Sequence, residues 1–209
     1  MRVELKLDWL KEQAVCEEAI AWVETQKDKD IFHLYAQAKK RNKLDWANWC
    51  VARLLDRKNR IRYAIFAAEQ VLHIFEKQYP EDQRPRKAIE AAKRVIEDDS
   101  EENRRIAHSA AYNAGSAYIA YSADIASNAY IAHSAASIAA DIAADSAYSV
   151  YNAYSAARNA AYIAAHSVAD SAYKEIQTKI VDYGVKLLRE QNNEKGGKND
   201  RTRTNALLT

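Results

Sequence analysis

The chain has 209 residues and nearly balanced charge, with 31 lysines and arginines against 29 aspartates and glutamates. This balance creates no global field that would attract nucleic acid or an anionic membrane, so a binding site must be local. Only 4 glycines and 2 prolines occur, while Ala, Leu, Ile, Glu, Lys and Arg are abundant. That composition disfavours strands and turns and predicts an all-α protein.

The first helices are indicated by apolar residues that recur at steps of three and four. This pattern predicts one helix over about 5–27, a second over 31–40 with Asp30 as its cap, and a third over about 44–57. Cys16 and Cys50 lie within such patterns and show neither a metal-binding nor a CxxC spacing. We therefore expect both cysteines to be reduced core residues.

Two prolines then set helix boundaries. A fourth helix runs from about residue 61 and ends at Tyr79, because Pro80 disfavours the α conformation of the residue before it. Pro85 suits the first turn of a fifth helix. Ser100 is a good cap for the helix that follows.

That helix enters a tract, from about residue 107 to 173, in which alanine recurs at every third position over long stretches. One unbroken helix of this length would extend on the order of 100 Å, so we expect roughly two to four segments. We expect bends near 113–116, 127–128, and 145–146 or 158–159. Tyr151, Tyr162 and Tyr173 recur every eleven residues, which favours a continuous helix through the last third.

These elements predict a compact multi-helix bundle or array with closely packed alanine-rich helices. Residues 1–100 would form an amphipathic helical part, with the Ala/Tyr/Ser-rich helical part, 101–190, packed on it as one domain. Residues 191–209 have too little apolar surface to order by themselves, and we expect a flexible tail there. No apolar run reaches the length of a membrane span and charges interrupt the N-terminal region, so we expect a cytoplasmic protein without a membrane partner.

The titratable residues form no catalytic pattern. His108 and His133 each precede a serine, but neighbours on a helix point about 100° apart and cannot act as nucleophile and base. The aspartates of the tract lack the Glu-x-x-His pair of a helical carboxylate metal site, and Gly-rich phosphate loops are absent. We predict no catalytic residue, no metal ligand and no cofactor.

Two groups of charged residues, within 53–62 and 82–90, lie near the two ends of the fourth helix. They could meet if the helices that hold them pack as a hairpin. They form either a structural network of salt bridges or a recognition site for an acidic or phosphorylated partner. Two tryptophans beside the first group are either core residues or anchors of that site. The candidate partner-binding residues are Arg53, Asp56, Arg57, Arg60, Asp82, Arg84, Arg86, Glu90, Trp46 and Trp49.

The segment from Val51 to Ala92, which runs directly into the alanine tract, resembles the Imm5-like family of immunity proteins found in bacteria and their phages. The resemblance covers about residues 44–175, and its most specific part is Tyr79-Pro-Glu-Asp-Gln-Arg-Pro-Arg-Lys-Ala-Ile-Glu90. It implies a non-enzymatic inhibitor that binds and neutralises a macromolecular partner. That partner would be a toxin in a bacterium, or a host defence protein when a phage carries the gene.

Within this hypothesis the binding surface is either the charged cluster or the Tyr/Ser/Asn faces of the tract, whose composition suits adaptable contacts. Two other functions stay open. A sponge for a small nucleotide signal would use Arg84 and Arg86 for phosphate contacts and nearby aromatic rings for stacking. A structural protein would pair its exposed faces with copies of itself as a homo-oligomer.

Overall fold

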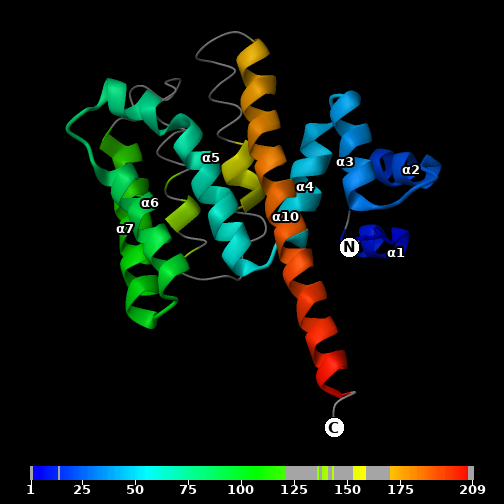
Figure 1. The fold of residues 1–209 in the computed structure, drawn as a ribbon. Coiled ribbons are helices and arrows are strands. Elements are labelled where there is room, and N and C mark those ends of the chain that lie inside the picture. Colours follow the sequence, from blue (N-terminus) through cyan, green and yellow to red (C-terminus); the bar gives the residue numbers. More distant parts are fainter. Residues whose placement is uncertain are drawn as a thin grey trace. The chain divides into compact units, whose positions relative to one another are not determined.

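The computed structural model describes residues 2–13, 15–120, 136, 138–140, 143, 153–158 and 170–206. This part of the chain is all-α, as predicted. Its helices are α1 (Leu7–Glu12), α2 (Glu17–Thr25), α3 (Ile31–Lys40), α4 (Leu44–Leu54), α5 (Arg57–Gln78), α6 (Arg84–Glu97), α7 (Glu101–Ala120) and α10 (Asp170–Ala206) (Figure 1). Residues 138–140 and 153–158 are also helical.

Helix α3 begins at the predicted cap. One carboxylate oxygen of Asp30 accepts hydrogen bonds from the backbone N–H groups of Phe32 (3.0 Å) and His33 (3.4 Å). The other oxygen accepts one from the N–H of Val3 at 2.9 Å, and the N–H of Ile31 donates to the carbonyl of Val3 at 2.8 Å. A single carboxylate therefore starts the helix and holds the N-terminal segment against it.

The expectation of one helix over 5–27 is wrong, because residues 13–16 separate α1 from α2. At 100° per residue, Leu10 and Val23 would lie about 140° apart around a single helix. One helix could not turn both side chains to the same core. As two helices they can, and Leu10 is buried in α1 and Val23 in α2.

The break also changes the environment of the first cysteine. Cys16 is exposed and occupies the position before α2 with an extended backbone, so the expectation that it is a core residue is wrong. Cys50 lies within α4 and is partly buried. Burial raises the pKa of the Cys50 thiol to about 12, although the nearby Arg53 cation acts in the opposite direction.

The end of α5 and the starts of α6 and α7 agree with the prediction, but α5 begins at Arg57, about four residues before its predicted start, because Asp56 caps it there. Helix α5 ends at Gln78, and Tyr79 has φ −131° and ψ 70°, away from the α region that Pro80 disfavours. Pro85 lies in the first turn of α6. The Ser100 hydroxyl caps α7 by accepting a hydrogen bond, at 3.4 Å, from the backbone N–H three residues later. The apolar residues that recur at steps of four and three along α5 are buried: Ile61, Ile65, Ala68, Leu72 and Phe75.

Alanine serves close packing in α7. Ala107, Ala111 and Ala114 are 0, 1 and 0% exposed, and their spacing places them on one side of the helix. Helix α7 packs against α6 (Figure 1), and the small side chains let the two backbones approach. The helical backbone of α7 continues through 113–116, where we expected a bend. The other expected bends, and two tyrosines of the eleven-residue repeat, lie outside or at the edge of the described residues.

Gly184 marks a close approach of α10 to α4 and α5. A Cβ at Gly184 would lie 2.6 Å from Cε2 of Tyr63 and even closer to Cγ1 of Val51. Tyr63 is fully buried, and its hydroxyl donates a 2.8 Å hydrogen bond to Oδ1 of Asn48. The Nδ2 of Asn48 donates in turn to the carbonyl of Tyr154 at 3.3 Å. This buried network fixes the ring against which the glycine packs.

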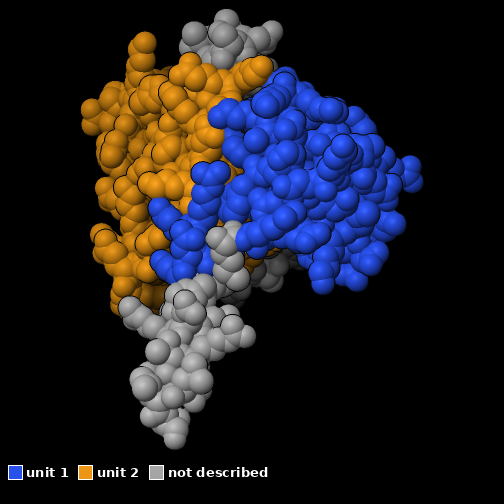
Figure 2. All heavy atoms as spheres, turned by 45° about the vertical axis from the view of Figure 1, so that its right-hand side comes forward, with its two compact units in different colours: residues 1–47, 189–209 blue, residues 48–188 orange. Residues whose placement is uncertain are grey.

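The chain forms two compact units, residues 1–47 with 189–209 and residues 48–188 (Figure 2). The bounds of these units differ from the predicted division at residues 100 and 190. The units are defined by contacts between residues in space, whereas the predicted parts are defined by composition along the sequence. The three-part division stays a prediction. Helix α10 continues to Ala206, through the stretch for which we expected a flexible tail, and the mobility of that stretch also stays a prediction.

Candidate functional site

Two ion pairs join α5 to α6 across the helical hairpin. The guanidinium of Arg86 donates from Nε and Nη2 to the two carboxylate oxygens of Glu76, at 2.6 and 2.7 Å. The Nζ of Lys93 lies 2.7 Å from Oε1 of Glu69. Glu69 and Glu76 are seven positions apart on α5, and their partners Lys93 and Arg86 are seven positions apart on α6 in the reverse order. The two helices are therefore antiparallel, and the ion pairs fix their register.

A hollow of about 260 Å³ lies between these helices. Its floor is apolar and consists of Leu72 and Ile89, which are 7 and 2% exposed. His73 and Glu90 occupy the middle of its walls, since each falls between the two ion-paired positions of its own helix. We call this hollow the α5–α6 groove. Its lining residues are Glu69, Leu72, His73, Glu76, Arg86, Ile89, Glu90 and Lys93.

The charges of the α5–α6 groove do not balance. Its two cations, Arg86 and Lys93, each pair with a carboxylate. Within the part of the chain that the structure describes, Glu90 has neither a hydrogen bond nor an ion pair, and the same holds for His73. The three glutamates of the groove therefore outnumber its two cations by one.

The proline turn before α6 holds a local pair. The carboxylate of Asp82 accepts hydrogen bonds from the backbone N–H of Arg84 at 3.0 Å and from its Nε and Nη2 at 2.9 and 2.6 Å. The Asp82 side chain is only 9% exposed. Both residues therefore stabilise the start of α6, which is a structural task.

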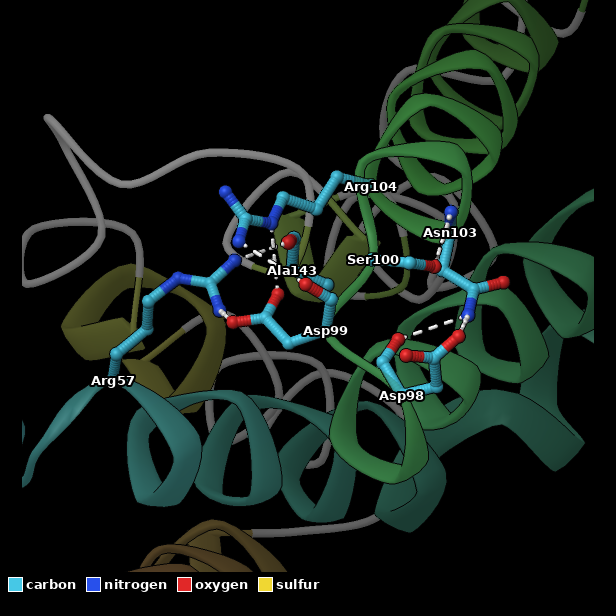
Figure 3. Close-up of polar contacts among 7 residues, drawn as sticks. All are labelled: Arg57, Asp98, Asp99, Ser100, Asn103, Arg104 and Ala143. Atoms are coloured by element: carbon cyan, nitrogen blue, oxygen red, sulfur yellow. Dashed lines mark hydrogen bonds and ion pairs between the residues drawn. The ribbon is translucent and has the colours of Figure 1, made fainter.

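The group at the start of α5 is also engaged in structural contacts (Figure 3). Asp56 caps α5 by accepting a 2.9 Å hydrogen bond from the N–H of Asn59. Arg57 donates to Oδ2 of Asp99 at 2.6 Å and to the carbonyl of Ala143 at 2.7 Å. It thereby ties α5 to the α6–α7 junction and to a residue of the alanine tract.

Asp99 lies between two arginines, as Figure 3 shows. The Nε of Arg104 donates to its Oδ1 at 2.8 Å, opposite the contact from Arg57. Partial burial raises the pKa of Asp99, but the hydrogen bonds and charges of the two arginines outweigh burial and hold the pKa below its ordinary value. The carboxylate is therefore firmly ionised at neutral pH.

Arg53 and Arg60 are partly buried cations. The guanidinium of Arg53 lies over the ring of Trp49, 4.0 Å from its centroid, a cation–π contact. Among the described residues no hydrogen-bond partner is placed at Nε of Arg53 or of Arg60, although both atoms are buried. Burial lowers the pKa of both groups.

Trp46 packs with another tryptophan. Its ring centroid lies 5.6 Å from that of Trp22, and the Nζ of Lys43 lies over the Trp46 ring, 4.6 Å from the centroid. Lys43 also pairs with Glu18 at 2.8 Å. Both tryptophans are only partly buried, so the choice between core residue and anchor stays open for Trp46.

The two predicted charged groups lie at opposite ends of α5. This helix has 22 residues, about 33 Å at 1.5 Å per residue. The prediction that the groups meet is wrong, because an antiparallel hairpin brings the start of α5 to the end of α6, where Arg57 contacts Asp99. It brings the start of α6 to the end of α5, where Arg86 contacts Glu76. These pairs favour the structural network, and a role in partner binding stays a prediction.

Four groove residues escaped sequence-based prediction: Glu69, His73, Glu76 and Lys93. In sequence they read as the solvated side of ordinary helices. A usable signal was the spacing of polar residues by four and then three on both sides of the turn, at 69, 73, 76 and at 86, 90, 93. That spacing places each set on one helix face.

The residues that the structure describes contain neither a candidate metal site nor a candidate membrane span. In this part of the chain, no three or more His, Cys, Asp or Glu side chains are grouped so that they could hold a metal ion. None of its helices combines the length and apolarity that a membrane crossing requires.

Residues 51–145 match the family described as Imm-5 like putative immunity protein. The match begins within α4 and includes all of α5, α6 and α7, and therefore the whole α5–α6 groove. The matched residues lie inside the segment, about 44–175, that resembles this family in sequence. The match confirms that resemblance. Comparisons with curated proteins and with solved structures gave no match.

Proposed function

We propose that the chain is a non-enzymatic immunity-type protein that binds a macromolecular partner and inhibits it. The similarity of residues 51–145 to an immunity-protein family carries this proposal. The partner is a toxin if the gene belongs to a bacterium, and a host defence protein if a phage carries it. Inhibition by stoichiometric binding needs a surface of defined shape and charge, and no reacting group.

The α5–α6 groove is the proposed contact surface. It combines an apolar floor with a charged rim, as protein interfaces do. The Glu76–Arg86 and Glu69–Lys93 pairs hold the rim charges in place before a partner arrives. A surface ordered in advance loses less conformational entropy on binding. Fixed charges of both signs also favour one docking register over others.

The nucleotide-sponge alternative has less support. Its phosphate-binding candidates, Arg84 and Arg86, already pair with the carboxylates of Asp82 and Glu76. A phosphate would have to displace a carboxylate from each guanidinium, and would gain little from an exchange of one anion for another.

A rescue assay tests the proposal. Each gene adjacent to this one in its source genome is expressed from an inducible promoter in a bacterial host, with and without the full chain. We expect one adjacent product to arrest growth, the chain to restore it, and the two purified proteins to bind in a defined ratio by calorimetry. If the chain neither protects against nor binds any adjacent product, the proposal is contradicted.

Two matched variants test the surface. Glu69→Lys reverses a groove charge that is 38% exposed and paired with Lys93. Glu175→Lys makes the same change on α10, where Glu175 is 66% exposed and paired with Lys179. We expect Glu69→Lys to weaken partner binding about tenfold or more, since it breaks the Glu69–Lys93 pair and reverses a charge that the partner must match, and Glu175→Lys to leave it unchanged. Equal effects would place the interface elsewhere.

A further inference from the structure

We propose that the α5–α6 groove receives a basic side chain, arginine or lysine, of the partner protein, with its cationic group at Glu90. This inference rests on the proposed function, because it names the chemistry of the partner at the same surface. It reverses the charge that the sequence indicates, since the arginines of this region suggest an acidic partner.

The charge of the expected partner is reversed because the basic side chains of this region already pair with carboxylates of the chain. Arg86 faces a carboxylate with two hydrogen bonds, at 2.6 and 2.7 Å, and Lys93 lies 2.7 Å from another. Arg84, just before the groove, donates from its backbone and side chain to Asp82. The carboxylate of Glu90 is the group in the groove whose charge no described residue neutralises. Among the described residues, an approaching ligand therefore meets one carboxylate without a partner, between two ion pairs.

The shape of the groove fits the same kind of side chain. Lysine and arginine carry a long apolar stem that packs along apolar surface while the charged head stays with polar groups. Leu72 and Ile89 offer that surface at the bottom of the hollow, and Glu90 lies at its wall. A hollow of about 260 Å³ accommodates one such side chain. Arginine can in addition meet the carboxylate with two parallel hydrogen bonds.

A probe that needs no partner tests this chemistry. The full chain, with labelled isoleucine and leucine methyl groups, is titrated with Nα-acetyl-arginine amide and, separately, with Nα-acetyl-citrulline amide, which has the same shape without the charge. We expect the arginine compound to shift the Ile89 and Leu72 signals with a Kd on the order of millimolar. We expect the citrulline compound to shift them at least fivefold less at equal concentration. Equal shifts would overturn the inference.

The variants Glu90→Gln and Glu97→Gln then locate the contact. Both glutamates are exposed on α6, but Glu97 lies beyond the groove. We expect Glu90→Gln to weaken binding of the arginine compound about fivefold, the loss of one partly exposed ion pair, and Glu97→Gln to leave it unchanged. Circular dichroism verifies that both variants stay folded. Unchanged binding by Glu90→Gln would overturn the inference.

The same variants separate this inference from the proposed function. If an adjacent gene product binds the wild-type chain and Glu90→Gln equally well, the function stands and the basic contact is refuted. If the arginine compound binds at Glu90 while every adjacent gene product fails to bind, the groove chemistry stands and the proposed function is refuted.

Discussion

Replacing Gly184 with alanine is expected to destabilise the fold, although alanine is the better helix former. The added Cβ would lie 2.6 Å from Cε2 of Tyr63 and closer to Cγ1 of Val51, whereas carbon atoms pack at about 3.5–4.0 Å. Neither neighbour can yield easily. Val51 and Tyr63 are 1 and 0% exposed, and Tyr63 is held by its hydrogen bond to Asn48.

Two opposing effects set the magnitude. Overpacking of a filled core costs about 1–3 kcal/mol, and contacts this short with two buried side chains place Gly184→Ala in the upper half of that range, at about 2–3 kcal/mol. The helix propensity of alanine offsets about 1 kcal/mol of that cost. We expect the free energy of unfolding of Gly184→Ala to fall by about 1–2 kcal/mol. For a chain of this size the melting temperature should drop by roughly 2–8 °C.

A double-mutant cycle with Val51→Ala distinguishes this clash from a general loss of packing. Unfolding in urea, followed by circular dichroism, gives the free energies of wild type, both single variants and the double variant. Because Val51→Ala removes the nearest atom, the double variant should be more stable than the sum of the single losses predicts, by about 0.5 kcal/mol or more. A Gly184→Ala protein as stable as wild type, or an additive cycle, would refute the reasoning.

Two further predictions concern ionisation. The pKa of Asp99 in the folded chain lies below its ordinary value, so its ion pairs stabilise the fold above the unfolded-state pKa of about 3.9 and are lost as pH falls through the folded value. Asp99→Asn should thus be less stable than wild type at pH 7, by up to about 1 kcal/mol per exposed pair, and the difference should shrink towards pH 3 in urea unfolding; a constant difference would contradict this. With a thiol-reactive dye at pH 8, the exposed Cys16 should react quickly and Cys50, whose thiol pKa is raised to about 12, should react only as the chain unfolds, since the thiolate is the nucleophile; two fast thiols would argue against burial of Cys50.

Local signals predicted the fold best where their physics acts within a few residues. The cap at Asp30, the stop before Pro80 and the cap at Ser100 each depend on neighbours one to three positions away, and all three are confirmed. The break between α1 and α2 was missed because it depends on the phase of apolar residues over a longer span. That phase, from Leu10 to Val23, was present in the sequence and could have been calculated.

The candidate site was less predictable, because the type of a residue does not show which side chain of the fold it will pair with. Arg84 and Arg86 are candidate anion binders in sequence, but Arg84 pairs with Asp82 within the turn, and the register of the hairpin pairs Arg86 with Glu76. Glu90 is a predicted site residue, and only the pairing of α5 with α6 shows that no residue in the described part of the chain forms an ion pair with it. Periodicity predicts which face of its own helix a residue occupies. It does not predict which residues of a neighbouring helix lie opposite that face.

The register of the α5–α6 hairpin also determines where the chain can tolerate insertions. A residue added in the turn, between Pro80 and Glu81, lengthens the loop and leaves the Glu76–Arg86 and Glu69–Lys93 pairs aligned. A residue added inside α5 between Glu69 and Glu76 rotates one of them by about 100° relative to the other, so both pairs cannot persist. Length differences among proteins of this kind should therefore collect in the turn, while the spacing within each helix stays fixed.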